Sequence, residues 1–393
     1  MTEFFNSVDL SRNQSLSADG ASNSPLIEYA LAGLDRCWLP DHGRWSHIYH
    51  LDGRSAPNES IPQSDVFYSL NVLLGLSRVP VKPQGLDLAA TYFSNAHALS
   101  VLPVRIYAWG MALWAAAELG LELPEDVLRR TRRLLADEDG WLEFRAQDLG
   151  MLLIGVVAQA RTGRPAWAQD ANALFQLLAK RFHAESGLFY DAAGGLRRRF
   201  SSFATQTYLA MACYHHGALS GNASAIAMAN QCVARLIDLQ GPSGEWPWFF
   251  DSVHGRVVDF YEVYSVHQYG MAPALLECAE QFEVPRARAA LVKGFHWVLG
   301  RNQLNRSMLV PELSLSIRSQ IRKGELLSSK PRAMRAVTNA MLRRSGGLIE
   351  PDNIDLRLEC RSYELGWILW SFGRRTDLTD LTHNEAFVRK SVP

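Results

Sequence analysis

The chain has 393 residues, and its 40 Lys and Arg residues balance 40 Asp and Glu residues. A net charge of zero excludes recruitment of a nucleic acid or an anionic membrane through bulk charge, so we expect neither partner. Hydrophobic residues make up 48% of the chain and include 11 tryptophans, which is enough material for a large core.

The first 23 residues are rich in Ser and Asn and lack the basic and apolar regions of a signal peptide. We therefore predict a flexible segment at 1–23. The five cysteines are scattered, which favours reduced thiols and a cytoplasmic location, and no apolar run is long enough to cross a membrane. Cys213 and His215 are close in sequence, but no second Cys–His pair would complete a zinc site. We expect no metal and no cofactor.

Segments with a 3.6-residue hydrophobic period follow one another through residues 24–375. Helices that are apolar on nearly every side are predicted at 64–78, 103–120, 145–162, 200–217, 261–283 and 360–374. Helices with a charged stripe are predicted at 24–38, 86–99, 124–137, 166–183, 222–239 and 285–299. The first kind is buried all round and the second faces water on one side. Their strict alternation predicts an all-α domain, a closed double ring of six helical hairpins, followed by a tail at 376–393.

The loops before the inner helices resemble one another: each carries Gly, then aromatic residues, then usually an acid. We expect short β-hairpin loops there. In such a ring the N-terminal ends of all inner helices lie at one end, which we call the mouth. Each inner helix opens with polar residues before it becomes apolar. The polar side chains expected at the mouth include Asp65, Arg105, Asp148, Gln206, Tyr264, His267, Gln268, Arg361, Tyr363 and Glu364.

Residues 244–271, GEWPWFFDSVHGRVVDFYEVYSVHQYGM, combine more aromatic and acidic residues than any other stretch. Aromatic and β-branched residues on the two sides of a turn after Asp251 predict a hairpin. The rest of the stretch has a helical period that puts Tyr264, His267 and Gln268 on one face. This face predicts one wall of a substrate pocket. The alternative is a buried hydrogen-bond network that fixes the core.

This arrangement resembles the (α/α)6 toroids of the six-hairpin glycosidase-like superfamily. WVLGRNQL at 297–304 is similar to a Leu-Gly-x-Asn turn in several of its hydrolases. GEWPWFF followed by YSVHQYGMAPALL is similar to a segment of glucuronyl C5-epimerases. The resemblance covers about residues 24–375 and implies a carbohydrate-active enzyme, whether hydrolase, lyase or epimerase. No complete catalytic signature of one family is present.

Asp251 and Glu262 are the first catalytic candidates, because glycoside hydrolysis needs one protonated and one ionised carboxyl group. Both follow or adjoin aromatic residues, whose desolvating effect would raise one pKa. The alternative is that Asp251 forms a turn and that Glu262 stabilises a helix N-terminus. A hydrolase that uses this pair is the first functional hypothesis.

Glu364 and Asp148 are further candidate acids. Glu364 lies one turn into a buried helix, where Arg361 at i−3 is a plausible ion-pair partner. Asp148 follows an aromatic loop and would be the second acid if Asp251 is not.

The second functional hypothesis is a uronate epimerase or polysaccharide lyase. Tyr264 and His267 would transfer the proton next to the substrate carboxylate, which Arg105 or Arg361 would bind. The third hypothesis is a toroid that binds a glycan or a protein and performs no chemistry. In each case the expected substrate-binding residues are Trp246, Trp248, Gln268, Arg361, Tyr363, Asp148, Arg105, Asp65 and Gln206.

Residues 301–358 depart from the hairpin scheme and are locally basic, with arginines that include Arg318, Arg322, Arg332 and Arg335. We predict an irregular insertion. One interpretation is a solvated helical excursion. The other is a lid that brings positive charge over a mouth that binds a uronate or a phosphate-bearing sugar. The sequence leaves the oligomeric state open.

Overall fold

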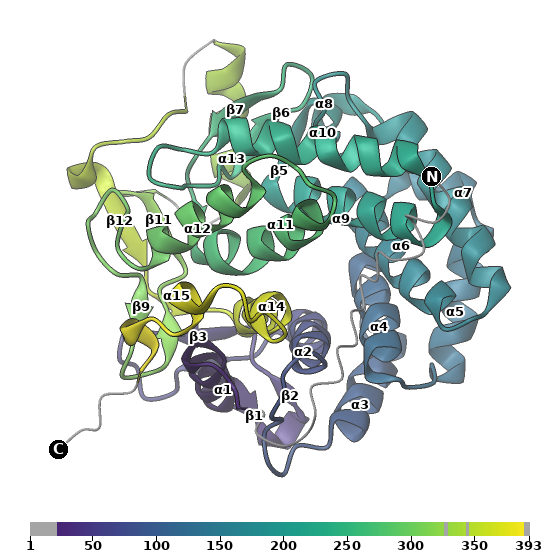
Figure 1. The fold of residues 1–393 in the computed structure, drawn as a ribbon, viewed down its shortest axis with the longest axis horizontal. Helices are drawn as coiled ribbons and strands as arrows, with labels where there is room; N and C mark the ends of the chain where they lie inside the picture. The colour runs from purple at the N-terminus through teal and green to yellow at the C-terminus, as the bar shows by residue number, and fades with distance from the viewer. Residues whose placement is uncertain (1–21, 326–328, 343–345, 389–393) are drawn as a thin grey trace.

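The computed structural model describes residues 22–325, 329–342 and 346–388, and it shows a ring of helices (Figure 1). Most of the predicted flexible segment at 1–23 and the end of the predicted tail lie outside the described residues. The inner helices contact one another in chain order, and the last of them closes the ring against the first. These are α2 (Pro62–Leu76), α4 (Ile106–Leu119), α6 (Ala146–Arg161), α9 (Phe203–Ser220), α11 (Ala272–Gln281) and α14 (Ser362–Phe372).

An outer layer of helices packs around this ring. Its members are α1 (Pro25–Cys37), α3 (Leu88–Val101), α5 (Glu125–Ala136), α7 (Pro165–Phe182), α10 (Ala223–Leu239) and α12 (Ala287–Val298). Asp87 and Asn222 cap α3 and α10 by accepting hydrogen bonds from backbone N–H groups of the first turn. The alternation of buried and striped helices in the sequence is thus the alternation of inner and outer helices, and the predicted (α/α)6 toroid is confirmed.

Glycines let neighbouring inner helices approach closely. A Cβ atom at Gly110 of α4 would collide with the backbone of Met151 in α6, and one at Gly155 of α6 would collide with the carbonyl of Gly110. Gly75 of α2 faces Gly366 of α14 in the same way. The narrow inner ring therefore depends on the missing side chains at these positions.

Short strands surround the mouth in small sheets. The three-stranded sheets are β5-β6-β7 (Phe200–Ser202, Phe249–Asp251, Arg256–Asp259), β13-β3-β4 (Glu359–Cys360, Ile48–His50, Asn58–Glu59) and β12-β11-β8 (Ile354–Arg357, Ser319–Arg322, Val263–Tyr264). The two-stranded sheets are β1-β2 (Trp38–Leu39, Arg44–Trp45) and β10-β9 (Leu315–Ser316, Leu309–Val310). Strands β6 and β7 form the hairpin predicted after Gly244.

The inner helix predicted at 261–283 begins later than expected. Val263 and Tyr264 belong to strand β8, which pairs with β11, so Tyr264 does not share a helical face with His267 and Gln268. Residues His267–Met271 then form a π-helical turn, η4, that leads into α11. The prediction failed because the partner strand of Tyr264 lies far away in the sequence.

The basic segment 301–358 is folded against the mouth in its described part. Its helix α13 (Ser329–Met341) packs Ala336 and Ala340 on a small apolar cluster with Phe200 and Phe249 of the β5-β6-β7 sheet. Its strand β11 joins β8. The interpretation as a solvated helical excursion is therefore wrong.

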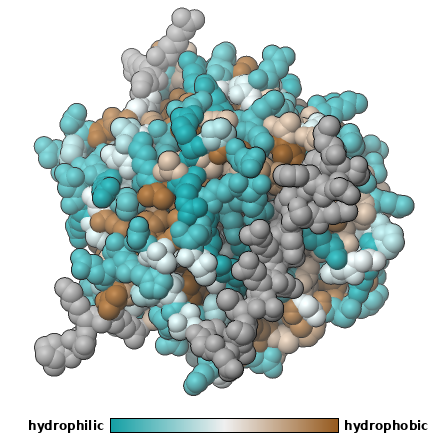
Figure 2. All heavy atoms as spheres, in the orientation of Figure 1, coloured by the Kyte–Doolittle hydropathy of each residue, from teal (hydrophilic) through white to brown (hydrophobic). Residues whose placement is uncertain are grey.

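Short helices complete the described chain: α8 (Gly195–Arg199), α15 (Thr379–Thr382), η2 (Pro40–His42), η3 (Asp139–Glu143), η5 (Pro351–Asn353) and η6 (Glu385–Phe387). Phe387 packs edge-on against Tyr29 and Phe295, so the described part of the tail is attached to the outer layer. None of the described helices is both long and apolar enough to cross a membrane. The face of the molecule in Figure 2 is mostly hydrophilic.

Gly110→Ala tests the close approach of α4 and α6. The added methyl group meets backbone that cannot move cheaply, so we expect the free energy of unfolding to fall by about 1–3 kcal/mol, despite the better helix propensity of Ala. Urea denaturation measures this change. Gly194→Ala is the control, since a Cβ atom there meets nothing within 4 Å. Equal stabilities of the two variants would contradict the packing argument.

Candidate active site at the mouth of the toroid

Tyrosines from several inner helices gather at the mouth. Tyr68 of α2 and Tyr363 of α14 have ring centroids 4.5 Å apart, and the hydroxyl groups of Tyr107 of α4 and Tyr208 of α9 lie within electrostatic range of Tyr68. Tyr208 is buried, and the other three are half-buried. Each lies in the first turns of its helix, and of the four only Tyr363 was among the side chains named as expected at the mouth.

Arg318 lies among these rings. Its guanidinium carbon is 5.1 Å from the ring centroid of Tyr264, and the Tyr363 and Tyr68 hydroxyls are within its electrostatic range. Its Nε is 3.2 Å from a carboxylate oxygen of Glu359. The sequence marked Arg318 only as one of many arginines in the basic segment, and β11 brings it to the mouth.

Tyr264 and His267 remain neighbours although they belong to different elements. Their ring centroids are 4.9 Å apart. Burial lowers the pKa of His267 to about 3, and its Nδ1 has no hydrogen-bond partner among the described residues. Burial also raises the pKa of Tyr264. Near neutral pH the pair is therefore an uncharged imidazole beside an uncharged phenol.

Asp251 is fully buried and surrounded by cations. Its carboxylate accepts hydrogen bonds from Arg199 at 3.1 and 2.8 Å, from His254 at 2.9 Å and from Arg256 at 3.2 Å. Burial alone would raise the pKa of Asp251, but the hydrogen bonds from Arg199 and His254 hold it at about 2. Asp251 is thus a fixed anion at the end of the β6–β7 hairpin.

Glu262 is equally buried and equally well paired. It accepts hydrogen bonds from Ser319, Arg332 and Arg357, and Arg357 is 3.2 Å from both oxygens. Burial opposes ionisation, but Arg318, Arg332 and Arg357 hold the pKa of Glu262 at about 2. The expectation that aromatic neighbours raise one pKa of the Asp251–Glu262 pair is wrong, because arginines from distant segments outweigh desolvation.

Glu364 is buried, and no cation of the described residues is in direct contact with it. Burial raises its pKa to about 7, and it accepts hydrogen bonds from Tyr269 at 3.0 Å and from Ser316. Arg361 donates instead to Glu359, at 2.7 and 3.2 Å. The ion pair predicted between Arg361 and Glu364 is therefore wrong, because the side chain of Arg361 turns back to the strand before its helix.

Asp148 and Arg105 form an ion pair at the mouth, with distances of 2.8 and 3.0 Å to the two carboxylate oxygens. Arg105 also lies over the ring of Tyr107, at 4.6 Å. Burial raises the pKa of Asp148, although Arg105 opposes the shift.

Three further predicted residues have structural partners. Gln206 bonds to both backbone groups of Phe189, each at 2.7 Å. Gln268 accepts from the Trp246 N–H at 3.3 Å and donates to the Tyr264 carbonyl at 3.2 Å. Asp65 accepts from the Ile61 N–H at the start of α2, at 3.2 Å. Of the three, Gln268 belongs to the face for which a buried hydrogen-bond network was the alternative to a substrate pocket, and its two bonds are of that kind.

Of the two predicted tryptophans, Trp246 is 1% exposed and belongs to the core, whereas Trp248 is half-buried beneath Arg332. His47 was not predicted: its ring stacks on Tyr68 at 4.8 Å and 16°. Only the HIY triplet in the loop before α2 marks it in the sequence, and loop histidines are too common for that to be specific.

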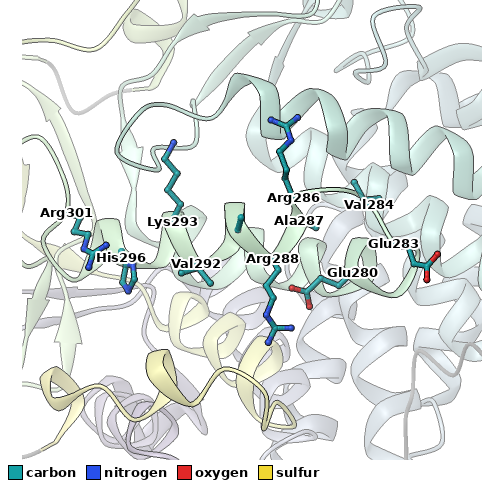
Figure 3. Close-up of a pocket in the computed structure, with 11 residues that line it drawn as sticks. Glu280, Glu283, Val284, Arg286, Ala287, Arg288, Val292, Lys293, His296 and Arg301 are labelled. Atoms are coloured by element: carbon teal, nitrogen blue, oxygen red, sulfur yellow. The ribbon is translucent and has the colours of Figure 1, made fainter.

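A separate cleft of about 840 Å³ lies on the outer layer between α11 and α12 (Figure 3). Its walls carry Glu280, Arg286, Arg288 and His296, and none of the predicted site residues lines it. The tyrosines and the ion pairs of the mouth make the mouth the better candidate site. Within the described residues, no three His, Cys, Asp or Glu side chains are grouped as a metal site requires.

Neither a protein-family model nor a curated protein sequence matches the chain. Solved structures do resemble it. Cellobiose 2-epimerase from Spirochaeta thermophila is 13% identical over 89% of this chain and 94% of its own, with a TM-score of 0.55. An unsaturated glucuronyl hydrolase from Bacillus sp. GL1 is 14% identical over 94% and 98%, with a TM-score of 0.54.

An α-1,6-mannanase from a Salegentibacter species, solved as an inactive variant with α-1,6-mannotriose, is 11% identical over 89% of this chain and 98% of its own, with a TM-score of 0.52. At such identities the likeness concerns the fold. The chain therefore has the fold of the six-hairpin glycosidase-like enzymes, as its helix pattern predicted.

Glu364 gives the stability a defined pH dependence. Its pKa is about 7 in the folded protein against an ordinary value of 4.5, so the stability from its neutral form is complete below 4.5 and is lost as the pH rises toward 7. Glu364→Gln keeps a neutral acceptor for Tyr269 and Ser316. We expect this variant to match the wild type at about pH 5 and to exceed its free energy of unfolding by about 1–3 kcal/mol at about pH 8.

Urea denaturation at the two pH values measures this difference. The exposed Glu125→Gln is the control and should show no such divergence. A difference between Glu364→Gln and the wild type that does not change with pH would contradict the raised pKa.

Proposed function

We propose that the protein is a carbohydrate-active enzyme that acts on a carboxylate-bearing sugar at the mouth of the toroid. The single observation that carries the proposal is the position of Arg318 over Tyr264, with His267 beside that tyrosine. An epimerase and hydrolases, among them glucuronyl hydrolases, are among the proteins that share the fold. Of the sequence hypotheses, this arrangement favours the uronate epimerase or polysaccharide lyase.

Proton abstraction beside a carboxylate needs a cation to hold that carboxylate and groups that exchange the proton. Arg318 would bind the substrate carboxylate, and its charge would stabilise the extra negative charge that develops when the neighbouring C–H bond breaks. His267 is uncharged, and its Nδ1 has no hydrogen-bond partner among the described residues. Burial and the charge of Arg318 hold its pKa at about 3, and a substrate carboxylate bound to Arg318 would offset that charge and let the imidazole accept a proton. Tyr264 is an uncharged phenol and can donate or relay one.

Return of a proton to the face of the carbon from which it was taken gives the starting sugar, and delivery to the opposite face gives the epimer. Tyr363 of α14 and Tyr68 of α2 also lie within electrostatic range of Arg318 and are the candidates for that second role. Loss of a leaving group from the adjacent carbon would instead complete an elimination. We infer a polysaccharide or oligosaccharide substrate, a cytoplasmic location and no cofactor.

Deuterium uptake tests this proposal. The wild type in D2O should exchange the hydrogen beside the carboxylate of a uronate oligosaccharide, as followed by proton NMR. Tyr264→Phe should slow the exchange by about 10²–10⁴, because it removes the proton-transferring hydroxyl without a change of shape. Tyr214→Phe, which removes a hydroxyl bonded to Asn230, is the control and should keep the activity.

The proposal fails if Tyr264→Phe exchanges as fast as the wild type, or if no uronate exchanges at all while reducing ends are released. Binding of the uronate without exchange would favour the non-catalytic binder.

A hydrolase is the second candidate, because burial raises the pKa of Asp148 at the mouth whereas Asp251 and Glu262 are held ionised. A carboxyl with a raised pKa can serve as the general acid. In this case Asp148→Asn should abolish the release of reducing ends from a glycan panel, and Asp251→Asn should retain it if the fold is intact by circular dichroism. Loss of activity in folded Asp251→Asn and Glu262→Gln, but not in Asp148→Asn, would restore the first predicted pair.

A further inference from the structure

A second group of cations lies on the other wall of the mouth. Arg105 and Arg145 are the residues that directly precede α4 and α6, and Arg197 belongs to α8, just before α9. The three arginines thus stand at the entrances of three consecutive inner helices. We call them the Arg105 cluster.

The cluster has more positive charge than its carboxylates neutralise. Arg105 pairs with Asp148 at 2.8 Å, and Arg197 lies 3.5 Å from Asp191. No carboxylate of the described chain lies within ion-pair distance of Arg145, whose pKa is lowered by burial and then by Arg197 and Arg105. Three guanidinium groups therefore face two carboxylates, and each repels the others.

The exposed surface of the cluster is cationic. The side chains of Arg105 and Arg197 are 42% and 56% exposed, whereas those of Asp148 and Asp191 are 8% and 10% exposed. One carboxylate oxygen of Asp191 already accepts a hydrogen bond from the buried Thr205 hydroxyl, at 2.6 Å. An anion that approaches from solvent meets the arginines first.

Tyrosines connect this cluster to the proposed site. Tyr107 lies under Arg105 and within electrostatic range of Tyr68. The ring of Tyr68 in turn lies 4.5 Å from that of Tyr363, which is within electrostatic range of Arg318. The two cationic walls are thus separated by flat aromatic side chains of the kind on which sugar rings stack.

We propose that the Arg105 cluster binds a second anionic group of the same glycan, one or more sugars away from the unit held at Arg318. The substrate would then be a polyanionic oligosaccharide, such as a chain of consecutive uronates, rather than a single uronic acid on a neutral chain. This inference rests on the proposed function, because Arg318 holds the first carboxylate. Guanidinium groups suit the role because they bind carboxylates through two parallel hydrogen bonds.

The N-terminal ends of α4 and α6 strengthen the cluster. Their unpaired backbone N–H groups and helix dipoles add partial positive charge where Arg105 and Arg145 lie. The unbalanced guanidinium charge, however, and not the helix ends, distinguishes this wall of the mouth. The repulsion among these arginines destabilises the protein without ligand, and a bound anion would relieve it.

Isothermal titration calorimetry with galacturonic acid, trigalacturonate and neutral maltotriose tests the proposal. Trigalacturonate should bind at least about tenfold more tightly than the monomer, and added salt should weaken it more. Arg145→Gln should weaken trigalacturonate by about three- to tenfold and leave the monomer unchanged. Because Arg145 has no carboxylate partner to lose, this variant should fold normally. Arg129→Gln, on the exposed face of α5, is the matched control.

Arg318→Gln separates this inference from the proposed function. It should weaken monomer and trimer alike. If trimer binding depends on Arg145 but not on Arg318, the anchor at Arg318 is refuted, and so is the inference that one glycan binds at both places. If binding depends on Arg318 but monomer and trimer bind equally well, only the role of the Arg105 cluster is overturned. Failure of trigalacturonate to bind, or binding that Arg145→Gln does not change, would also overturn it.

Discussion

The carboxylate of Glu262 is fully buried, and its ionisation depends on arginines from separate parts of the chain. Arg332 comes from α13 and Arg357 from β12, and Arg318 lies 3.7 Å away, just before β11. An unpaired carboxylate in this position would cost several kcal/mol, so the basic segment and the mouth stabilise each other. The same interaction places Arg318 among the tyrosines. The ion pairs of Glu262 thus both hold the basic segment against the mouth and fix the position of Arg318.

The helical ring could be predicted from the sequence because burial of a helix is a local property of its residues. An inner helix such as α6 is apolar on every side, whereas an outer helix such as α5 carries the stripe VLRRTRRLL. The strands at the mouth were harder to predict from the sequence, since strand pairing depends on residues far apart in the chain. Tyr264 fits a helical period as well as a strand, and only its pairing with Ser319 decides between them.

For the candidate site, the positions of some side chains could be predicted from the sequence, but the charge states and ion-pair partners could not. Tyr363 and His267 stand near the starts of inner helices, so topology alone brings them to the mouth. The ionisation of Asp251 was not predictable, because its aromatic neighbours in sequence suggest a raised pKa and the fold adds Arg199 and Arg256. Likewise, spacing suggested that Arg361 pairs with Glu364, but strand geometry directs it to Glu359. For Asp251 the fold adds a cation from a distant part of the chain, and for Glu364 the preceding strand takes away the expected cation.

This division of charges bears on what the mouth can do. Asp251 and Glu262 are held ionised by their arginine neighbours, so these two carboxylates cannot change protonation state near neutral pH. His267 and Tyr264 are uncharged at this pH, and the proposed mechanism assigns the proton transfer to them. An anionic sugar that enters such a site meets cations that are already fixed in position, so little reorganisation accompanies the build-up of negative charge beside its carboxylate. Ion pairs that look purely structural therefore also prepare the mouth for chemistry on an anion.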